Sequence, residues 1–162
     1  MALPRPKRFL PFSNHFTTVI VCLASVLIQS CGHGKQVYKS DCNDDKTFTR
    51  IDFKQLMDSL DDYDQEYVEV MGKYEEDKGL SALVNDSLFV DHSNKNALWV
   101  DFSQDCPLYL SGTHKGFFEY NDGQFTQIKN KTIVIRGMID LHNKGHLKQY
   151  KATIERVSLI KL

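Results

Sequence analysis

Short stretches of alternating apolar and polar residues fill most of the chain from residue 67 onward, with turn-forming residues between them. The clearest stretches occupy 67–75, 97–103 and 132–141, and weaker ones occupy 80–84, 87–91 and 149–162. A period of two is typical of strands that bury one face. The pattern therefore predicts a mainly β protein.

One helix is expected ahead of these strands. Asp52 suits the N-cap position, and Gln55 follows three residues later, which is the spacing of a capping box. The apolar residues after the cap recur at helical spacing and form one stripe: Phe53, Leu56, Met57 and Leu60. A stripe of this kind predicts a short helix that packs against the core.

Two other segments have no clear period. Residues 31–47 are polar and predict a flexible tether, so the folded domain is expected to span 48–162. Residues 104–130 contain Pro107, Gly112 and Gly116, which fit either a hairpin or a short irregular helix with a loop. In the last stretch, the step from Ile154 to Val157 breaks the alternation and predicts a bulge near Glu155-Arg156.

Two of the predicted strands share one design. VEVMGKY (68–74) and IVIRGMI (133–139) both place a glycine after two alternating apolar residues. A strand that bends sharply to serve both halves of a small barrel needs a residue without Cβ at the corner. The order of elements resembles the oligonucleotide/oligosaccharide-binding (OB) fold, a five-stranded Greek-key barrel, here with one N-terminal helix. The tail NKGHLKQYKATIERVSLI (143–160) is similar to that of small exported bacterial OB-type proteins, many of them lipoproteins.

The N-terminus has the layout of a secretory signal peptide. Arg5, Lys7 and Arg8 form a basic front, and residues 16–28 (FTTVIVCLASVLI) are largely apolar and carry no charge. A transmembrane helix needs about 20 apolar residues, so this run is short for a permanent anchor. We expect residues 1–30 to be a signal peptide. The alternatives are a secreted protein cut nearby and an uncleaved anchor.

The residues before Cys31 resemble a bacterial lipobox. Ile28 and Ser30 fit its aliphatic and small positions, whereas Gln29 departs from the usual Ala, Ser or Thr. The resemblance implies cleavage before Cys31, diacylglycerol on its sulfur and a fatty acid such as palmitate on its new amine. Gly32 stands where an Asp often marks retention in the inner membrane, so the expected location is the outer membrane of a Gram-negative envelope.

Cleavage at this point changes the charge of the protein. The whole chain has 20 basic and 21 acidic residues, and loss of the basic front leaves 17 against 21, a net charge of −4. Nucleic-acid binding relies on a basic surface, so we expect no nucleic-acid partner. The expected partners are the membrane, through lipid on Cys31, and an envelope protein, peptide or glycan.

Two cysteines remain after the signal and the lipid site. Cys42 and Cys106 form an even pair in an oxidising compartment, which fits a disulfide. The alternative is two free thiols. Neither cysteine belongs to a CxxC pair, so the sequence predicts neither a zinc ribbon nor a thioredoxin-like redox site.

The candidate ligand residues follow from the OB resemblance and from one turn. Ligands of many OB domains lie across the second and third strands, here near 80–103, which makes Trp99 and Phe102 candidates. Both also suit ordinary packing. His142 and His146 flank a turn and, with Asp140, suggest a small metal-binding or hydrolytic site, or else solvated turn residues.

No catalytic motif stands out in the chain, which contains no G-x-S-x-G, HExxH or GxxxxGK. We therefore expect a non-catalytic protein for binding or scaffolding, with no cofactor and no resident metal.

Overall fold

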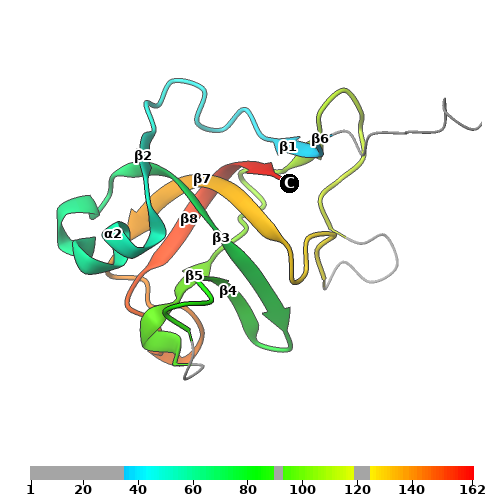
Figure 1. Ribbon diagram of the computed structural model, residues 1–162. Coiled ribbons are helices and arrows are strands. Elements are labelled where there is room, and N and C mark those ends of the chain that lie inside the picture. Colours follow the sequence, from blue (N-terminus) through cyan, green and yellow to red (C-terminus); the bar gives the residue numbers. More distant parts are fainter. Residues whose placement is uncertain (1–34, 90–92, 119–124) are drawn as a thin grey trace, which may run out of the picture. The chain divides into compact units, whose positions relative to one another are not determined.

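The computed structural model describes residues 35–89, 93–118 and 125–162, and the predicted signal peptide with Cys31 lies outside them. The strands are β1 (Val37–Lys39), β2 (Thr49–Ile51), β3 (Tyr67–Asp77), β4 (Leu80–Val84), β5 (Leu98–Val100), β6 (Tyr109–Leu110), β7 (Thr132–Asp140) and β8 (Thr153–Lys161) (Figure 1). The helical elements are α2 (Phe53–Asp58) and the 3-10 turns η1 (Leu60–Tyr63), η2 (Asn94–Asn96) and η3 (His146–Lys148).

Five strands close a barrel in the order β3, β4, β5, β8, β7 and back to β3. The pairs β3·β4, β4·β5, β8·β7 and β7·β3 are antiparallel, and β5·β8 is parallel. This pairing is that of a five-stranded OB-like Greek-key barrel. The predicted fold class is confirmed.

The two strand glycines lie where a neighbouring strand comes very close. A Cβ on Gly72 would lie 2.8 Å from Leu83 Cγ. A Cβ on Gly137 would lie 2.7 Å from the Glu155 carbonyl oxygen and 2.8 Å from Ile154 Cγ1. All three distances are shorter than van der Waals contact, so both positions require glycine for the close approach of the strands.

Replacing Gly137 with alanine should destabilise the barrel by about 1–3 kcal/mol, because the new methyl group meets backbone that cannot move away alone. Urea unfolding monitored by circular dichroism measures the change. Gly116→Ala is the matched control, since nothing lies within 4 Å of a Cβ at that position. Equal stability of the two variants would contradict the packing argument.

Helix α2 forms as its sequence predicts. Asp52 Oδ1 accepts hydrogen bonds from the backbone amides of Lys54 at 2.9 Å and Gln55 at 3.4 Å, which caps the helix. The predicted stripe lies in the core: Phe53, Leu56, Met57 and, in η1, Leu60. None of the helices in the described residues is long and apolar enough to cross a membrane.

The last strand carries the predicted bulge. The register between β7 and β8 shifts between Arg136 and Met138. Arg156, opposite this shift, has a φ of +50°, which allows the extra residues to loop out of the ladder. Asn43 Nδ2 donates a hydrogen bond of 2.6 Å to the Arg156 carbonyl and fastens the bulge from outside the barrel.

Two sequence expectations are wrong. The predicted tether of 31–47 contains an ordered strand among its described residues, because β1 pairs with β8 on one side and with β6 on the other. Tyr38 on β1 is completely buried, and its ring packs edge-on against Phe117 at 5.1 Å between centroids. Residues 87–89 of the predicted strand at 87–91 form a turn held by Asn85, and the rest of that stretch lies outside the described residues.

Candidate binding site

The chain between β5 and β7 leaves the barrel and is fastened to the segment that follows β1. Cys42 and Cys106 form a disulfide, with their Cα atoms 5.3 Å apart. The β1·β6 ladder, with Lys39 opposite Tyr109, adds a second attachment. The disulfide, one of the two alternatives left by the sequence, thus holds the segment from Pro107 to Tyr109 against β1.

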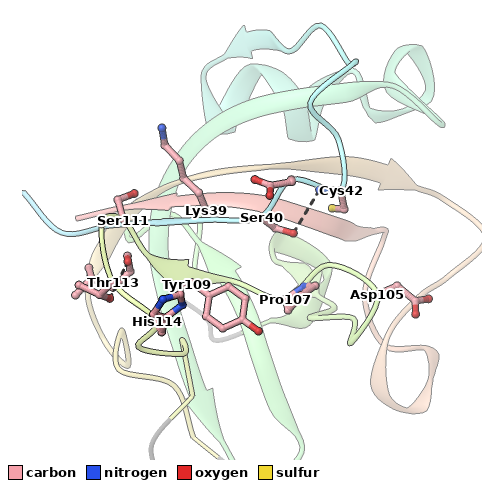
Figure 2. A pocket seen from close by; sticks show the side chains of 12 residues that line it. Lys39, Ser40, Cys42, Asp105, Pro107, Tyr109, Ser111, Thr113 and His114 are labelled. Carbon is pink, nitrogen blue, oxygen red and sulfur yellow. Dashed lines mark hydrogen bonds between the residues drawn. The ribbon is translucent and has the colours of Figure 1, made fainter.

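A polar cleft of about 730 Å³ lies on one side of this segment. Its lining is rich in hydroxyl and charged side chains: Lys39, Ser40, Asp41, Asp105, Tyr109, Ser111, Thr113 and His114. In Figure 2 the hydroxyl side chains of Ser111 and Thr113 mark one end of the cleft and Asp105 the other, with Tyr109 between them. The polar cleft thus offers many hydrogen-bond donors and acceptors around one aromatic ring.

A tight hairpin shapes one end of the polar cleft. Leu110 N donates to Lys115 O at 2.9 Å, and Thr113 Oγ1 donates to Leu110 O at 2.8 Å. Gly112, with a φ of +78°, supplies the left-handed conformation that the turn requires. These bonds give the Thr113 hydroxyl a fixed place in the cleft wall.

An apolar groove of about 470 Å³ shares Pro107 and Tyr109 with the polar cleft. Its apolar lining consists of Phe102, Pro107, Leu108, Tyr109, Phe117 and Phe118. The Phe102 ring contacts Phe117 at 4.9 Å and Phe118 at 6.0 Å between centroids. Tyr109 is 47% exposed and Phe118 is 43% exposed, so the groove presents two large aromatic side chains to its surroundings.

A buried carboxylate on β3 fastens the segment that follows the apolar groove residue Phe117. Glu76 on β3 accepts hydrogen bonds from Thr126 N at 2.9 Å and from Thr126 Oγ1 at 3.1 Å. The side-chain oxygen of the neighbouring Gln127 accepts a hydrogen bond of 3.2 Å from the Tyr38 hydroxyl. The backbone N–H of Gln127 donates a hydrogen bond of 3.4 Å to Phe117 O. Phe117 is thereby tied to the barrel wall and to β1.

The two predicted ligand residues belong to different surroundings. Trp99 is half-buried and lies between Tyr150, at 5.3 Å, and His146, at 6.4 Å between ring centroids. Gly145 is so close that a Cβ there would lie 2.6 Å from Trp99 Cβ. The loop after β7 therefore covers Trp99, which packs as an ordinary side chain. Phe102 lines the apolar groove instead.

The predicted metal residues are only partly brought together. His142 Nδ1 lies 3.4 Å from Asp140 Oδ1 and 3.9 Å from Asp64 Oδ2. One ligand atom from each of these three residues lies within 4.8 Å of the other two. His146 is not in this cluster, since it lies against Trp99 and near Gly79. Asp64 takes the place that the sequence gave to His146.

The surroundings of this cluster are acidic. Burial raises the pKa of the Glu155 carboxyl, and the negative charge of Asp140 raises it further. Each cluster carboxylate also accepts a backbone hydrogen bond, Asp64 from Leu141 N at 3.0 Å and Asp140 from His142 N at 2.7 Å. The Asp64–Asp140–His142 cluster therefore combines negative charge with oriented oxygen atoms.

Comparison with known proteins does not add a relative. The chain matches no protein-family model, and no curated protein or solved structure is significantly similar to it.

Proposed function

We propose that this is a lipid-anchored cell-envelope protein whose barrel binds a glycan in the polar cleft without transforming it. The anchor is inferred from the sequence before Cys31, which resembles a lipobox. The binding role is supported by one observation above all, the polar cleft that the Cys42–Cys106 disulfide holds beside the barrel.

The chemistry of the polar cleft suits a glycan. Sugars present many hydroxyl groups, which both donate and accept hydrogen bonds, and the cleft offers partners of both kinds. Lys39 donates, Asp41 and Asp105 accept, and Ser111 does either, whereas the Thr113 hydroxyl donates to Leu110 O and can only accept from a ligand. The half-exposed Tyr109 ring supplies a flat apolar surface against which the carbon face of a sugar ring can pack. The net charge of −4 after cleavage disfavours a nucleic acid.

The same residues favour binding over catalysis. Nucleophilic catalysis by a hydroxyl group needs a general base within hydrogen-bond reach. His114 is the only imidazole in the cleft wall. Within the described part of the chain it makes no hydrogen bond to a hydroxyl or carboxylate group. A recognition site requires no such pairing.

Replacing Tyr109 with alanine should weaken glycan binding by about tenfold, the size of effect typical of an aromatic residue at the centre of a site. The probes are N-acetylglucosamine oligomers and core oligosaccharides from lipopolysaccharide, with affinity measured by titration calorimetry. Met71→Ala is the matched control, because Met71 is 61% exposed and lies outside the cleft. Wild-type protein that binds neither probe class, or equal binding by the two variants, would overturn the glycan assignment.

The Asp64–Asp140–His142 cluster supports a second candidate, a metal-binding protein. Two carboxylates and an imidazole are a ligand set that zinc accepts. Titration of the metal-free chain with Zn²⁺, followed by calorimetry, should show one site in wild type that Asp140→Asn reduces by about tenfold or more. His146→Ala should leave the affinity unchanged, because His146 contacts Trp99 instead. Loss of binding in the His146 variant would restore the sequence-based ligand set.

A further inference from the structure

We propose that the apolar groove docks onto the lipid surface that holds the anchor, so that the barrel has a fixed orientation on the membrane. The occupant is a phospholipid bilayer carrying anionic headgroups. This inference rests on the proposed lipid at Cys31 and adds to it a second, non-covalent membrane contact.

The first step is the reach of the chain. Gln36 is fixed to the barrel, because its carbonyl accepts a hydrogen bond of 2.9 Å from Leu162 N. Gln36 is five positions after Cys31 in the sequence, and a fully extended chain spans at most about 18 Å over five positions. A lipid-anchored Cys31 therefore keeps the chain entry of the barrel within about 18 Å of the bilayer surface.

The second step is the position of the groove relative to this entry point. Ser111 N donates to Val37 O at 2.8 Å, and Tyr109 lies opposite Lys39 in the β1·β6 ladder. Figure 1 shows β1, β6 and the C-terminus at the same end of the barrel. The wall of the apolar groove that contains Tyr109 is thus part of the end that the anchor holds close to the bilayer.

The third step is the chemistry of the surface. The described residues include four exposed large hydrophobic side chains, Met71, Tyr109, Phe118 and Leu147. Two of them, Tyr109 and Phe118, line the apolar groove, and both are aromatic. Tyrosine is favoured at the boundary between headgroups and acyl chains, where its ring is apolar and its hydroxyl stays hydrated.

Charge supports the same orientation. Lys39 stands opposite Tyr109 on β1, and Lys115 is hydrogen-bonded through its backbone to Leu110 on β6. Over the described ranges, neither lysine forms an ion pair. Lysines close to a membrane are attracted by the negative charge of anionic lipid. Lys39 lines the polar cleft together with Asp41 and Asp105, and neither lysine lines the apolar groove, so the lysine charges act beside the groove and not within it.

Bromine quenching of a single tryptophan tests the orientation. The full chain is expressed in bacteria, purified from the membrane and reconstituted in vesicles of phosphatidylethanolamine, phosphatidylglycerol and dibrominated phosphatidylcholine. Trp99, the one tryptophan of the chain, is changed to Phe, and the reporter is Tyr109→Trp or Met71→Trp. Brominated lipid should quench the reporter at 109 at least about twofold more strongly than the reporter at 71. Lys39→Ala combined with Lys115→Ala should reduce that difference.

Every outcome decides between the two parts of the inference. The intact mass of the same sample shows whether Cys31 carries lipid. Equal quenching at 109 and 71 with lipid present overturns the docking and leaves the anchor in place. Stronger quenching at 71 also overturns it, since it places the surface of β3 around Met71 on the membrane instead of the groove. A mass without lipid rejects the anchor, and the docking proposal with it.

Discussion

Cys31→Ala should abolish the incorporation of labelled fatty acid into the protein. The proposed diacylglycerol is attached to the Cys31 sulfur, and alanine offers no nucleophile for that bond. The anchor is strong because several chains contribute, at about 0.8 kcal/mol for each buried methylene group. Growth with labelled palmitate, followed by gel autoradiography, measures incorporation, and intact mass reports whether the mature chain begins at residue 31.

Cys22 provides the control for this experiment. It lies in the apolar part of the predicted signal peptide, so Cys22→Ala should retain the full label and the wild-type mature mass. Equal labelling of the Cys31 variant and wild type would refute the lipid site. A mature chain that begins at another residue would favour the alternative of an ordinary secreted protein.

The barrel was predictable because its signals are local. Alternation of period two marks β3 and β7 within a few residues, and a glycine recurs at the same place in both. The structure gives these glycines a physical reason, since a Cβ on Gly72 or Gly137 would collide with the adjacent strand. A requirement of this kind leaves a trace at a single position of the sequence, which makes it visible without knowledge of the partner strand.

The attachment of β1 was not predictable in the same way. β1 has three residues and lies in a polar run, so it shows no period of its own. It forms because β8 and β6 supply hydrogen-bond partners on both sides and because Tyr38 finds a pocket against Phe117. Strand formation that depends on distant pairing leaves little local signal. The cysteine pair was the one feature of the sequence that connected these segments.

The surroundings of the candidate site residues were not predictable for a related reason. From the sequence, Trp99 is a plausible stacking surface for a ligand, but the loop that carries Gly145 and His146 covers it. Asp64 meets Asp140 and His142 only because β3 and β7 are neighbours in the barrel. Phe102 lines the apolar groove, but its neighbours Phe117 and Phe118 come from the segment whose structure the sequence left open.

Removing the disulfide by Cys42→Ser combined with Cys106→Ser should lower the free energy of unfolding by about 2–4 kcal/mol. The bond joins residues 64 positions apart, so it restricts a long loop of the unfolded chain. It also fastens the Pro107–Tyr109 segment to β1. This segment contributes Pro107 and Tyr109 to both the polar cleft and the apolar groove. We therefore expect the variant to lose glycan affinity even at temperatures where the barrel stays folded.

Reducing conditions separate the bond from the serine substitutions. A phosphine reductant should lower the free energy of unfolding of the wild type, measured in urea, to that of the double variant. The same reductant should leave the free energy of unfolding of the double variant unchanged. The barrel strands themselves contain no cysteine, so circular dichroism of the reduced protein should keep its β signal. Wild-type stability that is unaffected by reductant would show that the bond does not form in solution. In that case, the two residue pairs of β1·β6 and the three of β1·β8 alone would have to hold the cleft together.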